Sequence, residues 1–213
     1  MFVLDHVFVC TAPDESTTAL RRLGLTVQFE RQHPGQGTRN RLALFGPNYL
    51  ELLWLADRAE AEHNLVRLDR RVDWRQTGAS PFGIAMRGRK DDAPDVPWVH
   101  YQLEGFPVGL WIDGRTLDEP RLPLVFTFDR PADVPAGPAH GGYPKGLLQH
   151  ACGATAIDSV TVSGPGLGYA PALPLPSSVM LGEGPTPELT LVLQGASFEM
   201  TSVDPLLRVG GAA

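Results

Sequence analysis

An imidazole and a carboxyl group stand on two apolar segments near the start of the chain. His6 lies within the β-branched and aromatic run of residues 3–10, and Glu51 interrupts the apolar run of residues 49–55. A carboxylate that is buried without a partner is costly, or else it takes up a proton. We therefore expect Glu51 to bond a partner or to face a wet cavity. Together, the two groups form a mixed nitrogen and oxygen donor set, which suits Zn, Ni, Mn or Fe.

Further candidate ligand-binding residues lie on a turn and on apolar segments. The turn of residues 35–40 is able to bring backbone N–H groups and the Thr38 and Asn40 side chains to a ligand, and a plain hairpin turn is the competing interpretation. Trp111 and Phe126 are candidates for the lining of a cleft, although aromatic residues on strands more often belong to the core. His6 taken by itself also fits a hydrogen-bonded core histidine.

The elements that must position these residues follow the order β-α-β-β-β over residues 1–56. Alternation predicts a strand over residues 3–10, with Leu4, His6, Phe8 and Cys10 on one face and Val3, Asp5, Val7 and Val9 on the other. A helix is expected from about residue 15 to 23, with Asp14 as its N-cap. Strands are expected over residues 26–31, 39–45 and 49–55, the last with Tyr49, Glu51 and Leu53 on one face.

The rest of the chain divides into four further segments. Residues 57–80 are rich in Ala, Glu, Leu and Arg, which predicts a helical linker. Residues 81–130 hold short apolar runs bounded by turn residues, which predicts an intermediate, diverged module. Residues 131–149 show no periodicity and are expected to form a surface loop. Residues 150–213 contain further strand-like runs and form a last diverged module.

Composition excludes several classes of protein. The 213 residues are 43% hydrophobic and carry a formal net charge of -6, with no basic block that could follow a phosphate backbone, so nucleic acid is not an expected partner. The apolar runs are too short for a membrane span, and the N-terminus lacks a basic leader, so we expect a cytoplasmic protein. Two cysteines are too few for a disulfide framework, and both are expected to be free and buried. Phosphate loops, nucleophile elbows and Cys-His pairs are lacking, which argues against a nucleotide cofactor and against hydrolases.

An internal echo links the two ends of the chain. Residues 157–162, IDSVTV, repeat the pattern of residues 4–9, LDHVFV, position by position. The same comparison sets Glu199 at the place of Glu51 and Ser159 at the place of His6. It therefore predicts that the first and last modules pair, with two carboxyl groups approaching one cleft.

The chain resembles the glyoxalase-like branch of the vicinal oxygen chelate superfamily. The resemblance rests on LDHVFV (4–9), HPGQGTRN (33–40) and YLELLW (49–54), and it extends more loosely over PFGIAM (81–86), LPLVFTF (122–128) and HACGATAIDSVTV (150–162). It implies an α+β fold of paired βαβββ modules whose curled mixed sheets surround a cleft. The family includes metal-dependent isomerases, lyases and dioxygenases as well as metal-free binding proteins, and its members often pair modules across a homodimer.

The resemblance also implies a site. In metal-using relatives, a His on the first strand and a Glu on the fourth strand are ligands, and the partner module supplies two more; His6 and Glu51 match the first pair. Gly83 and Ser159 stand where the second His would be, so Glu199 is the expected third ligand, with His150 a possible addition.

This ligand set implies a small-molecule enzyme of the lyase, isomerase or dioxygenase type. Its divalent ion would be held by His6, Glu51 and Glu199 and would polarise vicinal oxygens of the substrate, with Glu51 and Glu199 as the catalytic carboxylates. The alternative is a metal-free protein that binds or sequesters a small molecule in the same cleft.

Overall fold

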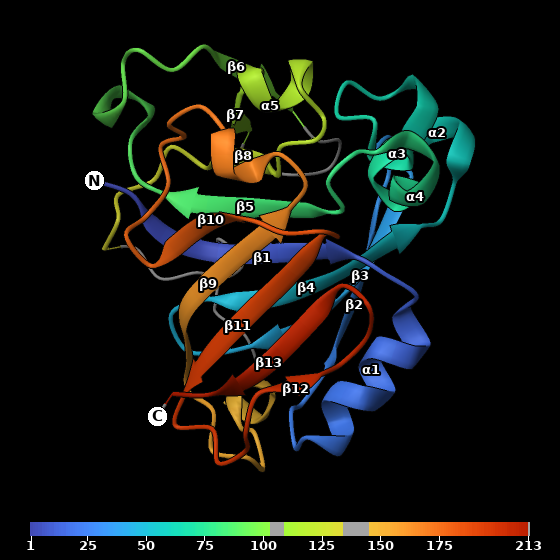
Figure 1. The fold of residues 1–213 in the computed structure, drawn as a ribbon, viewed down its shortest axis with the longest axis vertical. Helices are drawn as coiled ribbons and strands as arrows, with labels where there is room; N and C mark the ends of the chain where they lie inside the picture. Colours follow the sequence, from blue (N-terminus) through green and yellow to red (C-terminus); the bar gives the residue numbers. More distant parts are fainter. Residues whose placement is uncertain (103–108, 134–144, 213) are drawn as a thin grey trace.

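A computed structural model describes residues 1–102, 109–133 and 145–212 (Figure 1). The first module folds as β1 (Val3–Cys10), α1 (Pro13–Arg22), β2 (Gln28–His33), β3 (Thr38–Leu44) and β4 (Tyr49–Leu55). Three short helices follow, namely α2 (Arg58–His63), α3 (Leu68–Val72) and α4 (Trp74–Thr77). The next elements are β5 (Phe82–Arg87), η1 (Lys90–Asp92), β6 (Trp98–Tyr101), β7 (Leu110–Asp113), α5 (Gly114–Asp118) and β8 (Leu124–Thr127). The last are η2 (Lys145–Leu148), β9 (Ala156–Gly164), η3 (Leu167–Tyr169), β10 (Val179–Glu183), β11 (Glu188–Gln194), β12 (Thr201–Ser202) and β13 (Leu207–Gly211).

The larger sheet joins the first and intermediate modules. Its eight strands have the order β2-β3-β4-β1-β5-β8-β7-β6, in which β1 is parallel to β4, β5 is parallel to β8, and β1 and β5 are antiparallel neighbours. The two halves therefore have the same strand arrangement on either side of the β1–β5 contact. The mixed α+β fold expected from the resemblance is confirmed.

The last module forms a sheet of its own, which corrects the pairing suggested by the internal echo. Strands β10, β9, β11, β13 and β12 lie in that order, and within the described residues none of them pairs with a strand of the eight-stranded sheet. The echo reflects a similar local strand pattern in β1 and β9, and such a pattern does not specify which strand becomes a neighbour. The partner of the first module is the intermediate module.

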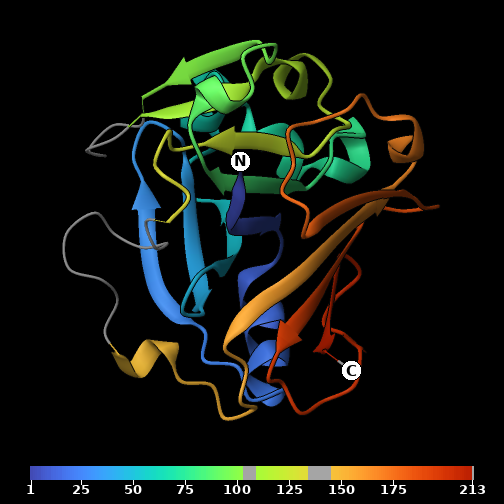
Figure 2. The same ribbon diagram turned by 90° about the vertical axis from the view of Figure 1, so that its left-hand side faces the viewer.

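The two sheets pack face to face. Figure 1 shows the strands of the smaller sheet crossing in front of β1 and β4, and Figure 2 shows the two sheets side by side. The shared core is built from alternate residues of both sheets, including Val7, Val9, Leu50, Leu52, Ile84, Val160, Leu191 and Val209. Burial of these apolar faces is the main stabilising contribution of the last module. The opposite face of the larger sheet is left for a second, smaller apolar cluster and a pocket.

A β-bulge changes the expected alternation of β1. The pairing of β1 with β5 shifts register between Leu4 and His6, so that Asp5 is an extra residue. Leu4 joins the core between the sheets together with Val7 and Val9, whereas Phe8 belongs to the cluster on the other face. The prediction that Leu4 shares a face with His6 is therefore wrong, because the bulge interrupts the period of two.

Other expectations need smaller corrections. Helix α1 begins at Pro13, with Ala12 as N-cap, so Asp14 lies in the first turn and does not cap the helix. The predicted surface loop of residues 131–149 falls largely on residues 134–144, which lie outside the described residues. Both cysteines are free and buried. Among the described residues, none of the helices has the length and apolarity needed to cross a membrane.

Candidate functional site

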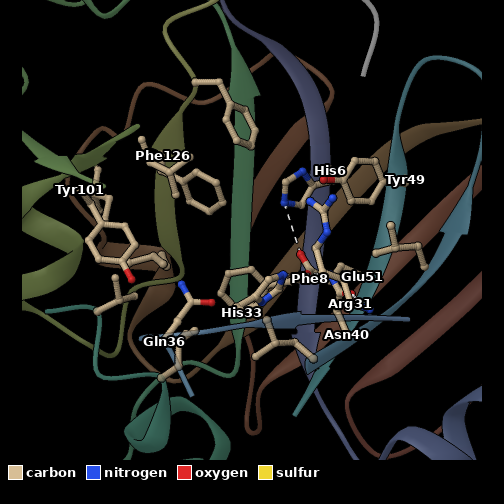
Figure 3. Close-up of a pocket in the computed structure, with 18 residues that line it drawn as sticks. His6, Phe8, Arg31, His33, Gln36, Asn40, Tyr49, Glu51, Tyr101 and Phe126 are labelled. Atoms are coloured by element: carbon tan, nitrogen blue, oxygen red, sulfur yellow. Dashed lines mark hydrogen bonds and ion pairs between the residues drawn. The ribbon is translucent and has the colours of Figure 1, made fainter. Parts of the chain in front are cut away.

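The candidate site is a pocket on the face of the larger sheet that the last module does not cover. It opens between the first and intermediate modules and has an empty volume of about 810 Å³, open solvent at its mouth included. Both polar and apolar side chains line the pocket (Figure 3). The polar group is His6, Arg31, His33, Gln36, Asn40, Tyr49, Glu51 and Tyr101. The apolar group is Phe8, Leu42, Leu53, Val66, Leu68, Leu110, Ile112, Leu124, Phe126 and Phe128.

His6 and Glu51 meet in this pocket from neighbouring strands. The Nε2 atom of His6 lies 3.4 Å from Oε2 of Glu51, and Figure 3 shows the contact. Phe8, two residues after His6, is the Cα partner of Glu51 in the parallel β1–β4 pair, which places both polar side chains on one face. The other ring nitrogen of His6, Nδ1, lies 2.8 Å from Oδ1 of Asp5. Asp5 is close enough because the bulge in β1 brings it to the His6 ring.

Arg87 supports the Asp5 carboxyl group from β5. Its Nε atom lies 3.5 Å from Oδ2 of Asp5, and its guanidinium donates to the carbonyls of Leu4 and Pro47. The Asp5 and Arg87 side chains are both buried, so the ion pair is little screened by solvent. Asp5 is thus fixed between a cation and the His6 ring.

Asn40 connects Glu51 with a second histidine. Its Nδ2 atom donates to Oε1 of Glu51 at 2.6 Å and lies 3.4 Å from Nε2 of His33. The backbone N–H of Arg31 donates to Oδ1 of Asn40 at 3.1 Å, which fixes the orientation of the amide. Both amide hydrogens of Asn40 are therefore directed at polar atoms of the pocket wall.

His33 is a neutral acceptor at Nε2. Thr38 donates its hydroxyl hydrogen to Gln36, and the Thr38 oxygen lies 2.9 Å from Nδ1 of His33, so the proton of the ring is on Nδ1. Burial lowers the pKa of His33 below its ordinary value, although the nearby Glu51 carboxylate partly opposes that shift. A neutral ring is then left with an unprotonated Nε2 facing Asn40.

Aromatic rings form the wall around His6. The Tyr49 ring stacks on the imidazole, with centroids 4.2 Å apart and an angle of 15° between the planes. Phe126 and Phe128 approach the same imidazole at 5.7 Å and 6.0 Å between centroids. The polar pair is thus set in an apolar surround, in which electrostatic interactions are stronger than in water.

The turn between β2 and β3 forms one rim of the pocket and is held by α2. Gly37 has a φ of 72°, and a Cβ at this position would lie 2.1 Å from the carbonyl oxygen of Asp57, so glycine is required there. The Glu60 carboxylate accepts hydrogen bonds from the backbone N–H groups of Gly35 and Gly37. These contacts direct the turn's N–H groups to Glu60, which favours a structural role for the glycines.

Of the four predicted ligand-binding residues, two line the pocket and two do not. Asn40 and Phe126 line the pocket, and Thr38 lies behind the lining, where it orients His33 and Gln36. Trp111 is not in the pocket lining, because Leu110 and Ile112 on either side of it face the cavity. Its ring instead contacts His100, with centroids 4.9 Å apart, and the ammonium group of Lys90.

Glu199 is not brought to the pocket. It is exposed in the segment that precedes β12, in the module that packs on the opposite face of the larger sheet. His150 is also remote: it accepts a hydrogen bond from the Thr26 N–H at Nδ1, and its Nε2 lies 2.9 Å from the carbonyl oxygen of Leu44. The expected convergence of Glu51 and Glu199 depended on the pairing of the first and last modules, which the structure does not have.

The donor set of the pocket does not fit the metal site implied by the resemblance. In the part of the chain that the structure describes, no three His, Cys, Asp or Glu side chains are grouped as a metal would require. Gly83 takes the place of a second His, and the Phe8 ring fills the space there, since a Cβ on Gly83 would lie 2.0 Å from that ring. On β8, Phe126 pairs with Ala85 as Glu51 pairs with Phe8, so the second carboxylate is replaced by an aromatic ring.

Sequence reasoning did not assign five polar lining residues to the site, namely Arg31, His33, Gln36, Tyr49 and Tyr101. His33 and Gln36 belong to the same turn motif, residues 33–40, as Asn40. Their closeness to Asn40 in the sequence could have placed them at the site. Tyr101 comes from β6, at the far edge of the larger sheet, and lines the pocket together with residues of the first module. A lone tyrosine in a short strand carries no such information.

Comparisons with known proteins agree with this architecture. The chain matches the family model described as glyoxalase-like domain over residues 4–170. A hypothetical protein from Staphylococcus aureus is 11% identical, with a TM-score of 0.60 and all of both chains covered, which shows the fold alone. No curated protein matches.

Other solved structures, with lower TM-scores, include two methylmalonyl-CoA epimerases. The one from Mycobacterium tuberculosis is 16% identical, with a TM-score of 0.39 over 61% of this chain and 87% of that chain. The one from Streptomyces coelicolor is 17% identical, with a TM-score of 0.43 over 67% of this chain and 98% of that chain. Both are too distant to support an argument about function. The family model, in contrast, spans most of the chain and both modules that form the pocket, and the chain therefore belongs to the glyoxalase-like domain family.

Proposed function

We propose that the protein is a small-molecule enzyme that moves a proton on an apolar carbonyl compound, with Glu51 as the base. The observation that carries the proposal is the setting of Glu51, which is 6% exposed, held by Asn40 at one oxygen, and faces His6 with the other. A positioned carboxyl group in a largely apolar pocket is the usual arrangement for proton transfer. Membership of the glyoxalase-like family supports an enzyme that acts on small molecules.

The proposed step is enolisation. The Glu51 carboxylate takes a proton from the carbon beside the carbonyl group, and the electron pair of the broken C–H bond forms an enolate. Return of a proton to that carbon completes an isomerisation or an exchange with solvent. His6, held at Nδ1 by Asp5, presents Nε2 on the same side and is placed to hold or pass the proton. The step uses only residues of the chain, because the donor set does not fit a metal.

A second candidate is a protein that binds a small molecule without transforming it. It is favoured by the apolar replacements in the intermediate module, where the Phe8 ring fills the side-chain space at Gly83 and Phe126 stands opposite. A cavity of this kind binds an apolar compound through surface burial alone.

Binding and exchange measured on one compound separate the two candidates. Calorimetry gives the affinity for acetophenone, and NMR in D2O follows the loss of its methyl protons, which lie beside the carbonyl group. We expect binding and catalysed exchange in the wild type, and unchanged binding with exchange about 100-fold slower or more in Glu51→Gln. Binding without catalysed exchange would favour the second candidate.

A further inference from the structure

The Tyr101 hydroxyl lies on the pocket wall opposite Glu51 and His6 (Figure 3). The residue is 7% exposed, and its phenol is part of the pocket lining. Burial raises the pKa of Tyr101 above its ordinary value, so the hydroxyl keeps its hydrogen at neutral pH. The direction of that hydrogen therefore matters for what the pocket binds.

Two amide groups donate to the Tyr101 oxygen. The Nδ2 atom of Asn64 lies 2.8 Å from it and also donates to the Gly35 carbonyl at 2.6 Å, so both hydrogens of Asn64 are used. The Val66 N–H donates to Oδ1 of Asn64, which fixes the orientation of this amide. Gln36 is the second donor, because its oxygen accepts from Thr38 and its nitrogen is directed at the phenol (Figure 3).

Among the partners that the described residues provide, the hydrogen of the Tyr101 hydroxyl is the part of this group that remains unused. With N–H donors on the oxygen, the phenol has only its own O–H left to offer. Within residues 1–102, 109–133 and 145–212, no group accepts a hydrogen bond from it. A buried donor of this kind costs free energy unless an acceptor satisfies it, and the pocket is the open space beside it.

We propose that the Tyr101 hydroxyl donates a hydrogen bond to an oxygen atom of the ligand, and that the pocket selects apolar compounds bearing a carbonyl-type acceptor. The ligand then lies between Tyr101, which binds its oxygen, and Glu51, which faces its carbon skeleton. This inference rests on the proposed function for the identity of the reacting carbon. The binding role of Tyr101 stands on the hydrogen-bond geometry alone.

The test compares two compounds of nearly equal shape in two proteins. Acetophenone carries the acceptor oxygen, and ethylbenzene lacks it. We expect the wild type to bind acetophenone more tightly, and Tyr101→Phe to weaken acetophenone about tenfold while leaving ethylbenzene unchanged. Tyr169→Phe removes a hydroxyl from a residue that is 91% exposed and outside the pocket, and it should change neither affinity.

Asn64→Asp provides a second test in which Tyr101 is retained. The carboxylate replaces a donor by an acceptor and should capture the Tyr101 hydrogen, so the affinity for acetophenone should again fall while that for ethylbenzene does not. Equal affinities for acetophenone in the wild type and Tyr101→Phe would overturn the inference, as would no binding of acetophenone to the wild type. Loss of exchange with the Tyr101 effect intact would contradict only the proposed function, because binding and exchange are separate readings.

Discussion

Asn40 holds Glu51 in place, with its amide nitrogen 2.6 Å from Oε1 of the carboxyl group. The same amide faces Nε2 of His33, so one side chain satisfies two buried acceptors. Glu51 is thereby left with a single oxygen directed at His6. The Asn40 amide thus connects Glu51 and His6 with His33, so a substitution of Asn40 tests how these buried polar groups are held.

Asn40→Ala should reduce both stability and exchange. Glu51 and His33 would each lose a donor while remaining buried, and we expect a loss of about 2 kcal/mol in the free energy of unfolding and a roughly tenfold slower exchange of acetophenone. Urea denaturation and NMR measure the two effects. Arg39→Ala changes an exposed neighbour on the same strand, and an Asn40→Ala protein that behaves like this control would contradict the role given to Asn40.

Gly83→Ala should destabilise the protein by about 1–3 kcal/mol. The added Cβ would meet the Phe8 ring at 2.0 Å, and the backbone of a central strand cannot move away easily. Chemical denaturation measures the loss, and Phe8→Leu in the same protein should recover part of it. Gly182→Ala is the matched control, because a Cβ there meets nothing closer than 4.0 Å. Equal stability of Gly83→Ala and wild type would mean that Phe8 does not fill this space.

Asp204 should be important for attaching the last module. Its carboxylate accepts hydrogen bonds from the Ser16 hydroxyl at 2.5 Å and the Thr11 hydroxyl at 2.9 Å, and from the backbone N–H groups of Leu206 and Leu207. Asp204→Asn should cost about 2 kcal/mol of unfolding free energy, since bonds to a charged group are replaced by weaker ones.

The exposed Asp158 provides the control for this change. Asp158→Asn on β9 removes the same charge without breaking such contacts, so its unfolding free energy should stay within about 0.5 kcal/mol of the wild type. An Asp204→Asn protein as stable as Asp158→Asn would show that the carboxylate does not attach the module.

Acid should destabilise the protein through its buried histidines. Burial lowers the pKa of His33 and of His150 in the folded state, so the unfolded chain binds protons first as the pH falls below the ordinary value of 6.5. Their contribution to stability is present in full above that value and is lost as the pH falls toward the folded pKa. Unfolding free energies measured between about pH 7.5 and pH 5.5 should therefore fall less in His33→Gln than in the wild type. The same slope in both proteins would mean that His33 is not buried in its neutral form.

Much of the first module could be predicted from its residues, because its strands alternate clearly. Glu51 was expected on one face with Tyr49 and Leu53, and all three line the pocket. The bulge at Asp5 could not be read from the sequence, since LDHVFV fits an uninterrupted strand equally well. Its consequence, the contact between Asp5 and His6, was therefore missed.

The partner of the first module could not be predicted for a different reason. IDSVTV resembles LDHVFV more closely than PFGIAM does, yet PFGIAM forms β5, the neighbour of β1. Strand pairing depends on the packing of whole faces, and both β5 and β9 offer apolar alternation to the core. Glu199 was placed by the echo alone, so its expected position failed together with that pairing.

The exchange of the acetophenone methyl protons in D2O, with EDTA present, measures whether Glu51 transfers a proton without a metal. We expect the wild type to accelerate exchange with all divalent metal chelated and added Zn, Ni, Mn or Fe not to increase the rate. Glu51→Gln should be at least about 100-fold slower with unchanged affinity. Exchange that appears only when one of these metals is added, or that persists at the wild-type rate in Glu51→Gln, would contradict proton transfer by Glu51 without a metal.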